Sequence, residues 1–346
     1  MAEAGKIKSL LFFFLKIFLA ATVVWILFSR GQQEILKGLK NFDYRFLLPA
    51  FFFQFFQLIV SSWRWKVLAG VLNVKLSFFE ALSLTMQGNF FSLVIPGGAI
   101  GGDVVKMAVI SKRSGSGNKM EGVFTVFMDR VVGMISLFSL TLLLLIPSAK
   151  LLMGLQFAQF PRDPRLNVLF IAGTALLCLA GLGASGMIFF HRTLFKLPGM
   201  RTLAEKAENL SHGAVSRMTG AADFYASSWK KLIFLVLITT FFVHLAATLP
   251  FFFLLRGLET EFSFFAVILA VNIGNIAGLI PLFPGGIGIR DLVTVTILSA
   301  SSIAAGDAKA AMLLATALML VINLSGGIFF IFDPGRRKQE VKNGQQ

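Results

Sequence analysis

Cysteine, histidine and charged side chains are all scarce in this sequence. The one cysteine, Cys178, permits no intramolecular disulfide, and the three histidines are too scattered to suggest a metal site. Charged residues make up 14% of the chain, whereas a soluble domain carries about 25%. The sequence also lacks the Gly-x-x-x-x-Gly-Lys-Ser/Thr motif of an ATP-binding loop. With no change in composition to mark off a soluble part, we expect a single domain over residues 1–346 that holds no metal and no cofactor.

Hydrophobic residues, in contrast, make up 56% of the chain. A membrane-spanning helix needs roughly 20 predominantly apolar residues. Six runs approach or reach that length, at about 9–29, 46–62, 122–147, 166–190, 232–255 and 308–332. These runs predict an all-α polytopic membrane protein with about six full spans.

One motif occurs twice in the chain. The first copy, from Gly88 to Asp103, contains Asn89, Pro96, Gly97 and Gly98; the second, from Gly274 to Asp291, contains Asn275, Pro284, Gly285 and Gly286. Each copy is an apolar run followed by Pro-Gly-Gly and then by charged residues. Because proline and glycine interrupt helices, each run is predicted to turn back inside the membrane. The prediction is two re-entrant helical hairpins, at about 78–110 and 262–301; the alternative is two glycine-rich loops that resemble each other by chance.

The distribution of lysine and arginine predicts the orientation of the chain. With the N- and C-termini in the cytoplasm, cytoplasmic segments carry nineteen of these residues and outside segments nine, as the positive-inside rule requires. The cytoplasmic segments include 191–231, interpreted as amphipathic surface helices or as a plain connection, and a basic tail at 333–346. The net charge of +15 then reflects loops held against an anionic leaflet of the cell membrane, not binding of nucleic acid.

The number of spans between the two predicted hairpins sets their relative orientation. Three full spans separate them, and three is odd, so the hairpins are predicted to enter the membrane from opposite sides. Two copies in opposite orientation form an inverted repeat. Inverted repeats with broken helices near the midplane are common in secondary transporters.

A small set of ionisable residues lies within the predicted membrane segments, where each needs a partner or a wet cavity. The set is Asp103, Lys106, Asp129, Arg130, Arg290 and Asp291. Asp103 and Lys106 are three residues apart and can pair, whereas the adjacent Asp129 and Arg130 point to different neighbours. One hypothesis is a structural ion-pair network. The other is a cavity for a charged headgroup, in which Lys106, Arg130, Arg290 and the helix N-termini after each Pro-Gly-Gly bind an anion.

Two further pairs lie on the second predicted span. Arg64 and Trp65, at its end, are typical of a membrane–water interface. Gln54 and Gln57 are three residues apart on one helix face, where they either hydrogen-bond to a neighbouring helix or line a transport path.

Four motifs in order resemble the flippase-like transmembrane domain of the lysylphosphatidylglycerol synthase family. They are Arg64-Trp65, Pro96-Gly97 with Asp103 and Lys106, Met128-Asp129-Arg130, and Pro284-Gly285-Gly286-Ile287-Gly288 with Asp291. The resemblance covers nearly the whole chain. It departs from the family pattern at Gly101-Gly102, which lengthens the first loop, and at Gly133, where the family often has an acid.

The resemblance implies a protein that moves lipid between leaflets. The cargo would be an anionic or aminoacylated phospholipid or a polyprenyl-phosphate-linked lipid, and a second copy or a lipid-synthesis enzyme is the candidate protein partner. The family's aminoacyl transfer belongs to a separate soluble domain. Since the chain ends at Gln346 soon after its last span, we expect no synthase activity.

Two alternatives to transport remain open at this point. One is an integral-membrane transferase acting on lipid-linked substrates, with Asp103, Asp129 and Asp291 as its candidate acids, although no Asp-x-Asp motif or histidine cluster supports it. The other is a membrane scaffold that transports nothing.

Overall fold

The computed structural model describes residues 32–95, 99–113, 119–155, 163–189, 199, 214–280 and 287–332, and their regular structure is helical throughout. Five of the described helices are long and apolar enough to cross a membrane. They are Tyr44–Val71, Lys119–Met153, Pro164–Met187, Trp229–Gly257 and Ala305–Ile331. The protein is therefore a polytopic membrane protein, and five of the six predicted spans are confirmed. The sixth, at 9–29, lies outside the described residues.

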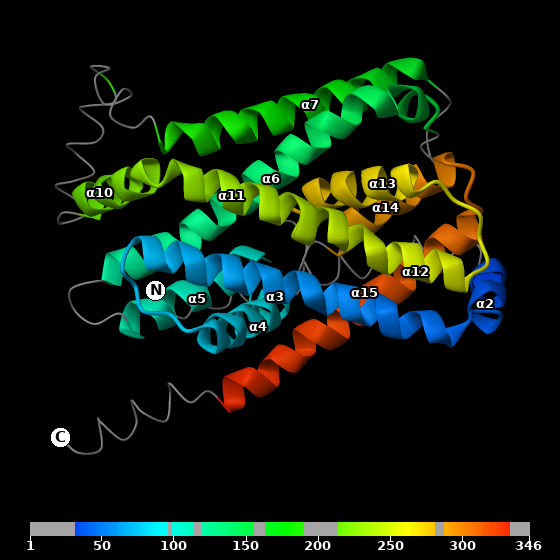
Figure 1. Cartoon of the computed structure of the whole chain (residues 1–346). Helices are drawn as coiled ribbons and strands as arrows, with labels where there is room; N and C mark the ends of the chain where they lie inside the picture. The colour runs from blue at the N-terminus through cyan, green and yellow to red at the C-terminus, as the bar shows by residue number, and fades with distance from the viewer. Residues whose placement is uncertain are drawn as a thin grey trace, which may run out of the picture.

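The helices of these spans carry the labels of Figure 1. They are α3 (Leu47–Val71), α6 (Lys119–Met153), α7 (Pro164–Met187), α11 (Trp229–Thr239) with α12 (Leu249–Gly257), and α15 (Ala305–Ile331). The short 3-10 helix η1 (Tyr44–Phe46) precedes α3. A π-helix, η2 (Thr240–Leu245), and a 3-10 turn, η3 (Ala246–Thr248), join α11 to α12. The predicted span at 232–255 is thus one transmembrane segment with an irregular middle.

Side-chain caps fix where several helices begin. The Ser77 hydroxyl accepts the backbone N–H of Glu80, and the Glu80 carboxylate accepts the N–H of Ser77, which together form a capping box at the start of α4 (Phe78–Val94). Asp163 accepts the N–H of Arg165 at the start of α7, where Pro164 occupies a first-turn position that needs no donor.

Helix α6 is the longest element and runs through the centre of the bundle (Figure 1). Its first half packs, through residues such as Val126 and Val131, in a core cluster with α3 and α4. Its second half packs, through Leu145 and Leu152, in a cluster with α12 and α13. The span was predicted to end at Pro147, but the helix continues to Met153. Proline removes its own N–H donor and crowds the preceding turn, but the helix continues beyond it and Leu152 packs in the apolar core.

Two pairs of shorter helices fold back on themselves. In the first, α4 and α5 (Ala99–Arg113) approach so closely that a Cβ added at Gly102 would overlap the carbonyl of Gly88. In the second, α13 (Phe264–Ala277) and α14 (Ile289–Ala300) approach at Gly274, where Thr294 occupies the space of a Cβ. The α4–α5 pair lies nearer the end of the molecule that carries α10, and the α13–α14 pair nearer the end that carries α2 (Figure 1).

Two smaller helices complete the described fold. Helix α2 (Gln32–Lys40) lies across the start of α15, with Gly38 close to Asp307. Helix α10 (Ala214–Ser227) covers the predicted surface segment in part and docks on the bundle through Tyr225, whose hydroxyl donates to the Leu68 carbonyl at 2.9 Å. Burial raises the pKa of Tyr225, and the Asp129 carboxylate raises it further, so the hydroxyl stays a donor. The stretches 191–198 and 200–213 and the basic tail 333–346 lie outside the described residues.

Candidate functional site

A buried ion pair joins α3 to α6. The Nε atom of Arg64 lies 2.8 Å from Oδ1 of Asp129, and the two side chains are 7% and 8% exposed. Arg64 Nη1 also donates to the Thr239 hydroxyl at 3.2 Å. Neighbouring Trp65 is fully buried and donates its indole N–H to Thr125 at 3.1 Å. Both side chains turn into the bundle, because α6 supplies their partners, and their position at the depth of the membrane–water interface stays a prediction.

Lys106 on α5 joins this buried group. Its Nζ lies 4.4 Å from the centre of the Trp65 ring, in a cation–π contact, and its stem packs against Gly88. The predicted pair of Asp103 with Lys106 is replaced by an ion pair with Arg130, since Asp103 Oδ1 accepts from Arg130 Nη2 at 2.9 Å and Oδ2 accepts from Nε. The adjacent Asp129 and Arg130 therefore pair with two different helices, as predicted.

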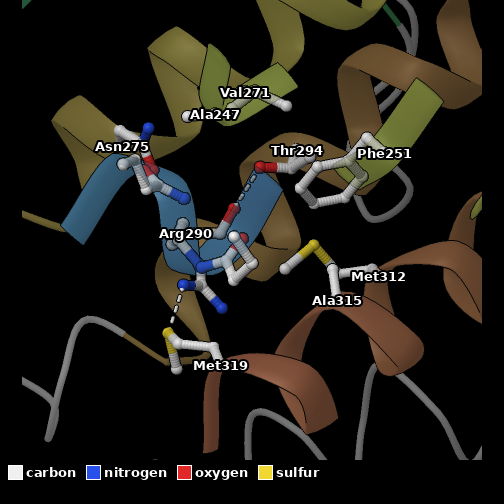
Figure 2. Close-up of a pocket in the computed structure, with 11 residues that line it drawn as sticks. Ala247, Phe251, Val271, Asn275, Arg290, Thr294, Met312, Ala315 and Met319 are labelled. Carbon is white, nitrogen blue, oxygen red and sulfur yellow. Dashed lines mark hydrogen bonds between the residues drawn. The ribbon is translucent and has the colours of Figure 1, made fainter. Parts of the chain in front are cut away.

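The second helix pair carries its own arginine. Arg290 Nη2 lies 2.8 Å from Asp291 Oδ1 and also donates to the Thr316 hydroxyl at 3.0 Å. Its Nη1 faces the sulfur of Met319 at 2.9 Å, and a thioether is a weak acceptor (Figure 2). Asp291 is fully buried and accepts the N–H of Gly288 at 3.3 Å. Gly288 has φ 98°, a left-handed value that favours glycine, so this residue lets α14 begin beside the carboxylate.

Two cavities adjoin the helix pairs. The first, of about 230 Å³, is bounded by α3, α4, α6 and α15, and both Asn89 and Arg130 line it. The second, of about 60 Å³, is bounded by α3, α12, α13, α14 and α15, and Asn275 and Arg290 line it (Figure 2). Gln54, Gln57 and Met319 line both cavities. The same three side chains therefore connect the surroundings of the two arginines.

The structure sorts the predicted site residues into groups. Asn89, Arg130, Asn275 and Arg290 line the two cavities, and Asp103 and Asp291 hold the arginines. Lys106 and Asp129 belong to the buried group with Arg64 and Trp65, and these four do not line either cavity. Pro96, Gly97, Gly98, Pro284, Gly285 and Gly286 lie outside the described residues.

Several cavity residues did not enter the predicted site. The sequence predicts a transport role for Gln54 and Gln57 only as an alternative, and it predicts no role for Asn323 and Met319. Asn323 carried a usable signal, because an amide in the middle of the apolar run 308–332 needs a polar surrounding. Met319 carried none, since a methionine is ordinary in a membrane helix.

The charges of the described site do not cancel. Four cations, Arg64, Lys106, Arg130 and Arg290, lie with three carboxylates, Asp103, Asp129 and Asp291. Of these four cations Arg130 is the most accessible, with 45% of its side chain exposed. The two arginines that line the cavities are each paired with an aspartate, and the excess positive charge belongs to the buried group of Arg64, Asp129 and Lys106. The field of this excess charge favours an anionic ligand over a cationic one.

Membrane-spanning helices around a polar, arginine-lined interior define a multi-pass membrane protein with a candidate intramembrane binding site. Residues 13–327 match the family described as the lysylphosphatidylglycerol synthase TM region. The chain belongs to this family, which confirms the resemblance seen in the sequence. It is also similar to the UPF0104 membrane protein PH1989 of Pyrococcus horikoshii, with 25% identity over 332 residues, 92% of this chain and 96% of that relative.

Proposed function

We propose that this protein is a flippase-like translocator, without enzymatic activity, that moves an anionic lipid between the leaflets of the cell membrane. In this proposal the α4–α5 and α13–α14 pairs are re-entrant hairpins. Their helices have 17, 15, 14 and 12 residues, or roughly 18–26 Å at 1.5 Å per residue. A hydrocarbon core of about 30 Å exceeds each of these lengths.

The two pairs lie toward opposite ends of the central helix α6, which supports entry from opposite leaflets and an inverted repeat (Figure 1). With both chain termini in the cytoplasm, α4–α5 enters from the cytoplasmic side and α13–α14 from outside. Broken helices that meet near the midplane are the usual surroundings of a substrate site in secondary transporters.

One observation carries the proposal: two cavities, each with an arginine held by an aspartate, share a wall formed by Gln54, Gln57 and Met319. A lipid phosphate can bind Arg130 beside the first hairpin and then Arg290 beside the second, passing the two amides between them. The aspartates keep each arginine from holding the anion too tightly for release. The acyl chains stay in the bilayer during this movement.

The test is a lipid-movement assay on purified protein reconstituted in vesicles that contain phosphatidylglycerol with a fluorescent acyl chain. Each buried pair is neutralised as a unit, as Asp103→Asn with Arg130→Gln and as Asp291→Asn with Arg290→Gln, because removal of one partner leaves a buried charge. A hydrogen bond to a charged group contributes about 1.5–3 kcal/mol, so we expect a fall in rate of about 10- to 100-fold.

A matched control is available at the surface. Asp43 and Arg45 form an ion pair in which the arginine side chain is 91% exposed, and Asp43→Asn with Arg45→Gln should move lipid at the wild-type rate. Normal movement in both buried-pair variants would contradict the proposal. Conversion of the lipid to a new product would favour the transferase, and a folded wild-type protein that moves no lipid would favour the scaffold.

A further inference from the structure

We propose that the cavities select an anionic lipid whose headgroup carries free hydroxyl groups, such as a glycerol, inositol or sugar phosphate, over an aminoacylated lipid. The inference rests on the proposed function, because the headgroup must enter the same cavities. It concerns the chemistry of their walls, which neither the family nor the relative specifies.

The larger cavity is walled by side-chain amides. Gln54, Gln57, Asn89 and Asn323 line it, and none of these four side chains hydrogen-bonds to another described residue. An amide offers two N–H donors and a carbonyl acceptor. A hydroxyl group both donates and accepts, so it satisfies both ends of an amide. A bare phosphate only accepts, and it would leave the four amide carbonyls unpaired.

The charged groups of the larger cavity disfavour an ammonium group. No carboxylate lines the cavity within the described residues, because Asp103 directs both its oxygens to Arg130 and Asp129 pairs with Arg64. The ammonium of an aminoacyl headgroup would find no free acid there. Its N–H groups could donate to the amide carbonyls, but its charge would face the 45% exposed Arg130 side chain without a free carboxylate to offset the repulsion.

The smaller cavity repeats this chemistry. It combines Arg290 with three amides, Gln54, Gln57 and Asn275, and Asp291 is committed to the arginine. A headgroup that passes from Arg130 to Arg290 therefore meets one cation and several amides at both positions. The 230 Å³ of the larger cavity equals the liquid volume of about eight water molecules, which suits a small polyol.

The experiment compares lipids with identical acyl chains in the reconstituted vesicles. Phosphatidylglycerol and phosphatidylpropanol carry the same charge and differ only by the two headgroup hydroxyls. Lysylphosphatidylglycerol has one of these hydroxyls esterified and adds the two ammonium groups of lysine. We expect phosphatidylglycerol to move about tenfold faster than either of the other two lipids. Phosphatidylpropanol lacks the hydroxyl groups and would leave the amides of the cavity wall unpaired. Equal rates for phosphatidylglycerol and phosphatidylpropanol, or faster movement of lysylphosphatidylglycerol, would overturn the inference and leave the proposed function standing.

Two variants connect the preference to the amides. Gln57→Leu should bring the ratio of the phosphatidylglycerol and phosphatidylpropanol rates to about one. Gln57→Glu keeps the shape of the side chain and adds a carboxylate, so it should shift the preference toward lysylphosphatidylglycerol. An unchanged preference in both folded variants would contradict the inference.

A second readout separates this inference from the proposed function. Retention of the same three lipids by the detergent-purified protein is measured by native mass spectrometry. If no lipid moves in vesicles, the proposed function fails. The inference is then decided by which of the three lipids the purified protein retains most. Preferential retention of phosphatidylglycerol supports it, and equal retention of the three lipids overturns it.

Discussion

At the scale of single residues, Gly133 on α6 lies beside the Arg64 guanidinium and leaves room there for a side chain. A Cβ at this position would lie 3.5 Å from Arg64 Nη1, at ordinary contact distance, so a side chain fits beside the guanidinium. The family often has an acid here. In this chain Arg64 is paired with Asp129, while Lys106 adds a second cation to the same group.

We predict that Gly133→Asp raises the thermal stability of the protein, because a second carboxylate balances the excess positive charge of Arg64, Lys106 and Asp129. A gain on the order of 1 kcal/mol would raise the unfolding temperature by a few degrees. The measurement uses the single cysteine of the chain, Cys178, which is fully buried and reacts with a thiol-specific dye only after unfolding. Gly133→Asn is the uncharged control, and equal stability of the two variants would contradict the prediction.

The site is only partly predictable at this scale. Adjacent residues on a helix point in different directions, and this geometry was enough to predict separate partners for Asp129 and Arg130. The partners themselves, Arg64 and Asp103, lie 65 and 27 residues away. Their identity depends on which helices pack together, which no local pattern contains.

At the scale of helices, close packing between α4 and α15 depends on one glycine. A Cβ added at Gly326 would overlap the backbone carbonyl of Met86, and the next residue, Gly327, packs on the Phe90 ring. The rings of Phe91 and Phe330 also meet, with centroids 5.0 Å apart. Helix α15 thereby holds the first helix pair next to the cavities.

We predict that Gly326→Ala destabilises the protein by about 1–3 kcal/mol, the usual cost of overpacking. A glycine on α7, Gly173, has no neighbour within 4 Å of an added Cβ. Gly173→Ala should therefore be neutral or stabilising by up to about 1 kcal/mol, because alanine favours a helix. Labelling of Cys178 during heating measures both variants, and equal effects of the two alanines would contradict the close approach of α4 and α15.

Hydropathy predicted that the described spans exist, but it did not predict where the helix within a span becomes irregular. The irregular middle of the Trp229–Gly257 span, with its π-helix, left no signal in the apolar run 232–255. The structure supplies a tertiary reason, because His244 in the π-helix lies with Nε2 3.1 Å from the Gly133 carbonyl on α6, and Thr239 just before it accepts from Arg64. Contacts of this kind override local helix preference.

At the scale of the whole molecule, the proposed topology makes a definite statement about accessibility. Exposed Lys75 and Lys112 flank the first helix pair, and exposed Glu261 and Ala305 flank the second. If both pairs are re-entrant, the two residues that flank one pair share a side of the membrane. If the pairs enter from opposite leaflets, the two sets lie on opposite sides.

We predict that single cysteines at Lys75 and Lys112, placed in a Cys178→Ala background, react with a membrane-impermeant maleimide only after the cells are opened. Cysteines at Glu261 and Ala305 should react in intact cells. The readout is the mass shift of the labelled protein. Labelling of the two residues of one set from different sides would show a plain crossing, and labelling of both sets from the same side would contradict the inverted repeat.

The sequence was informative about membrane class and family and uninformative about the cavities. Long apolar runs predicted the described spans, and four short motifs predicted the family, since both signals are local. The cavities depend on how α3 and α15 lie between the two helix pairs, with Gln54 and Met319 far apart in the chain. Their walls are set by close approaches such as the one at Gly326, which hydropathy does not record.

The neighbouring positions of Asp129 and Arg130 have a mechanical consequence. One faces α3 and the other α5, so a rotation of α6 about its own axis strains both ion pairs at once. Rotation far enough to exchange the two partners would place Asp129 against Asp103 and Arg130 against Arg64, which are like charges. The two ion pairs together therefore hold α6 in one rotational setting. An anion that replaces Asp103 at Arg130 would release one of the two attachments, and the pair of Asp129 with Arg64 would keep the helix in that setting.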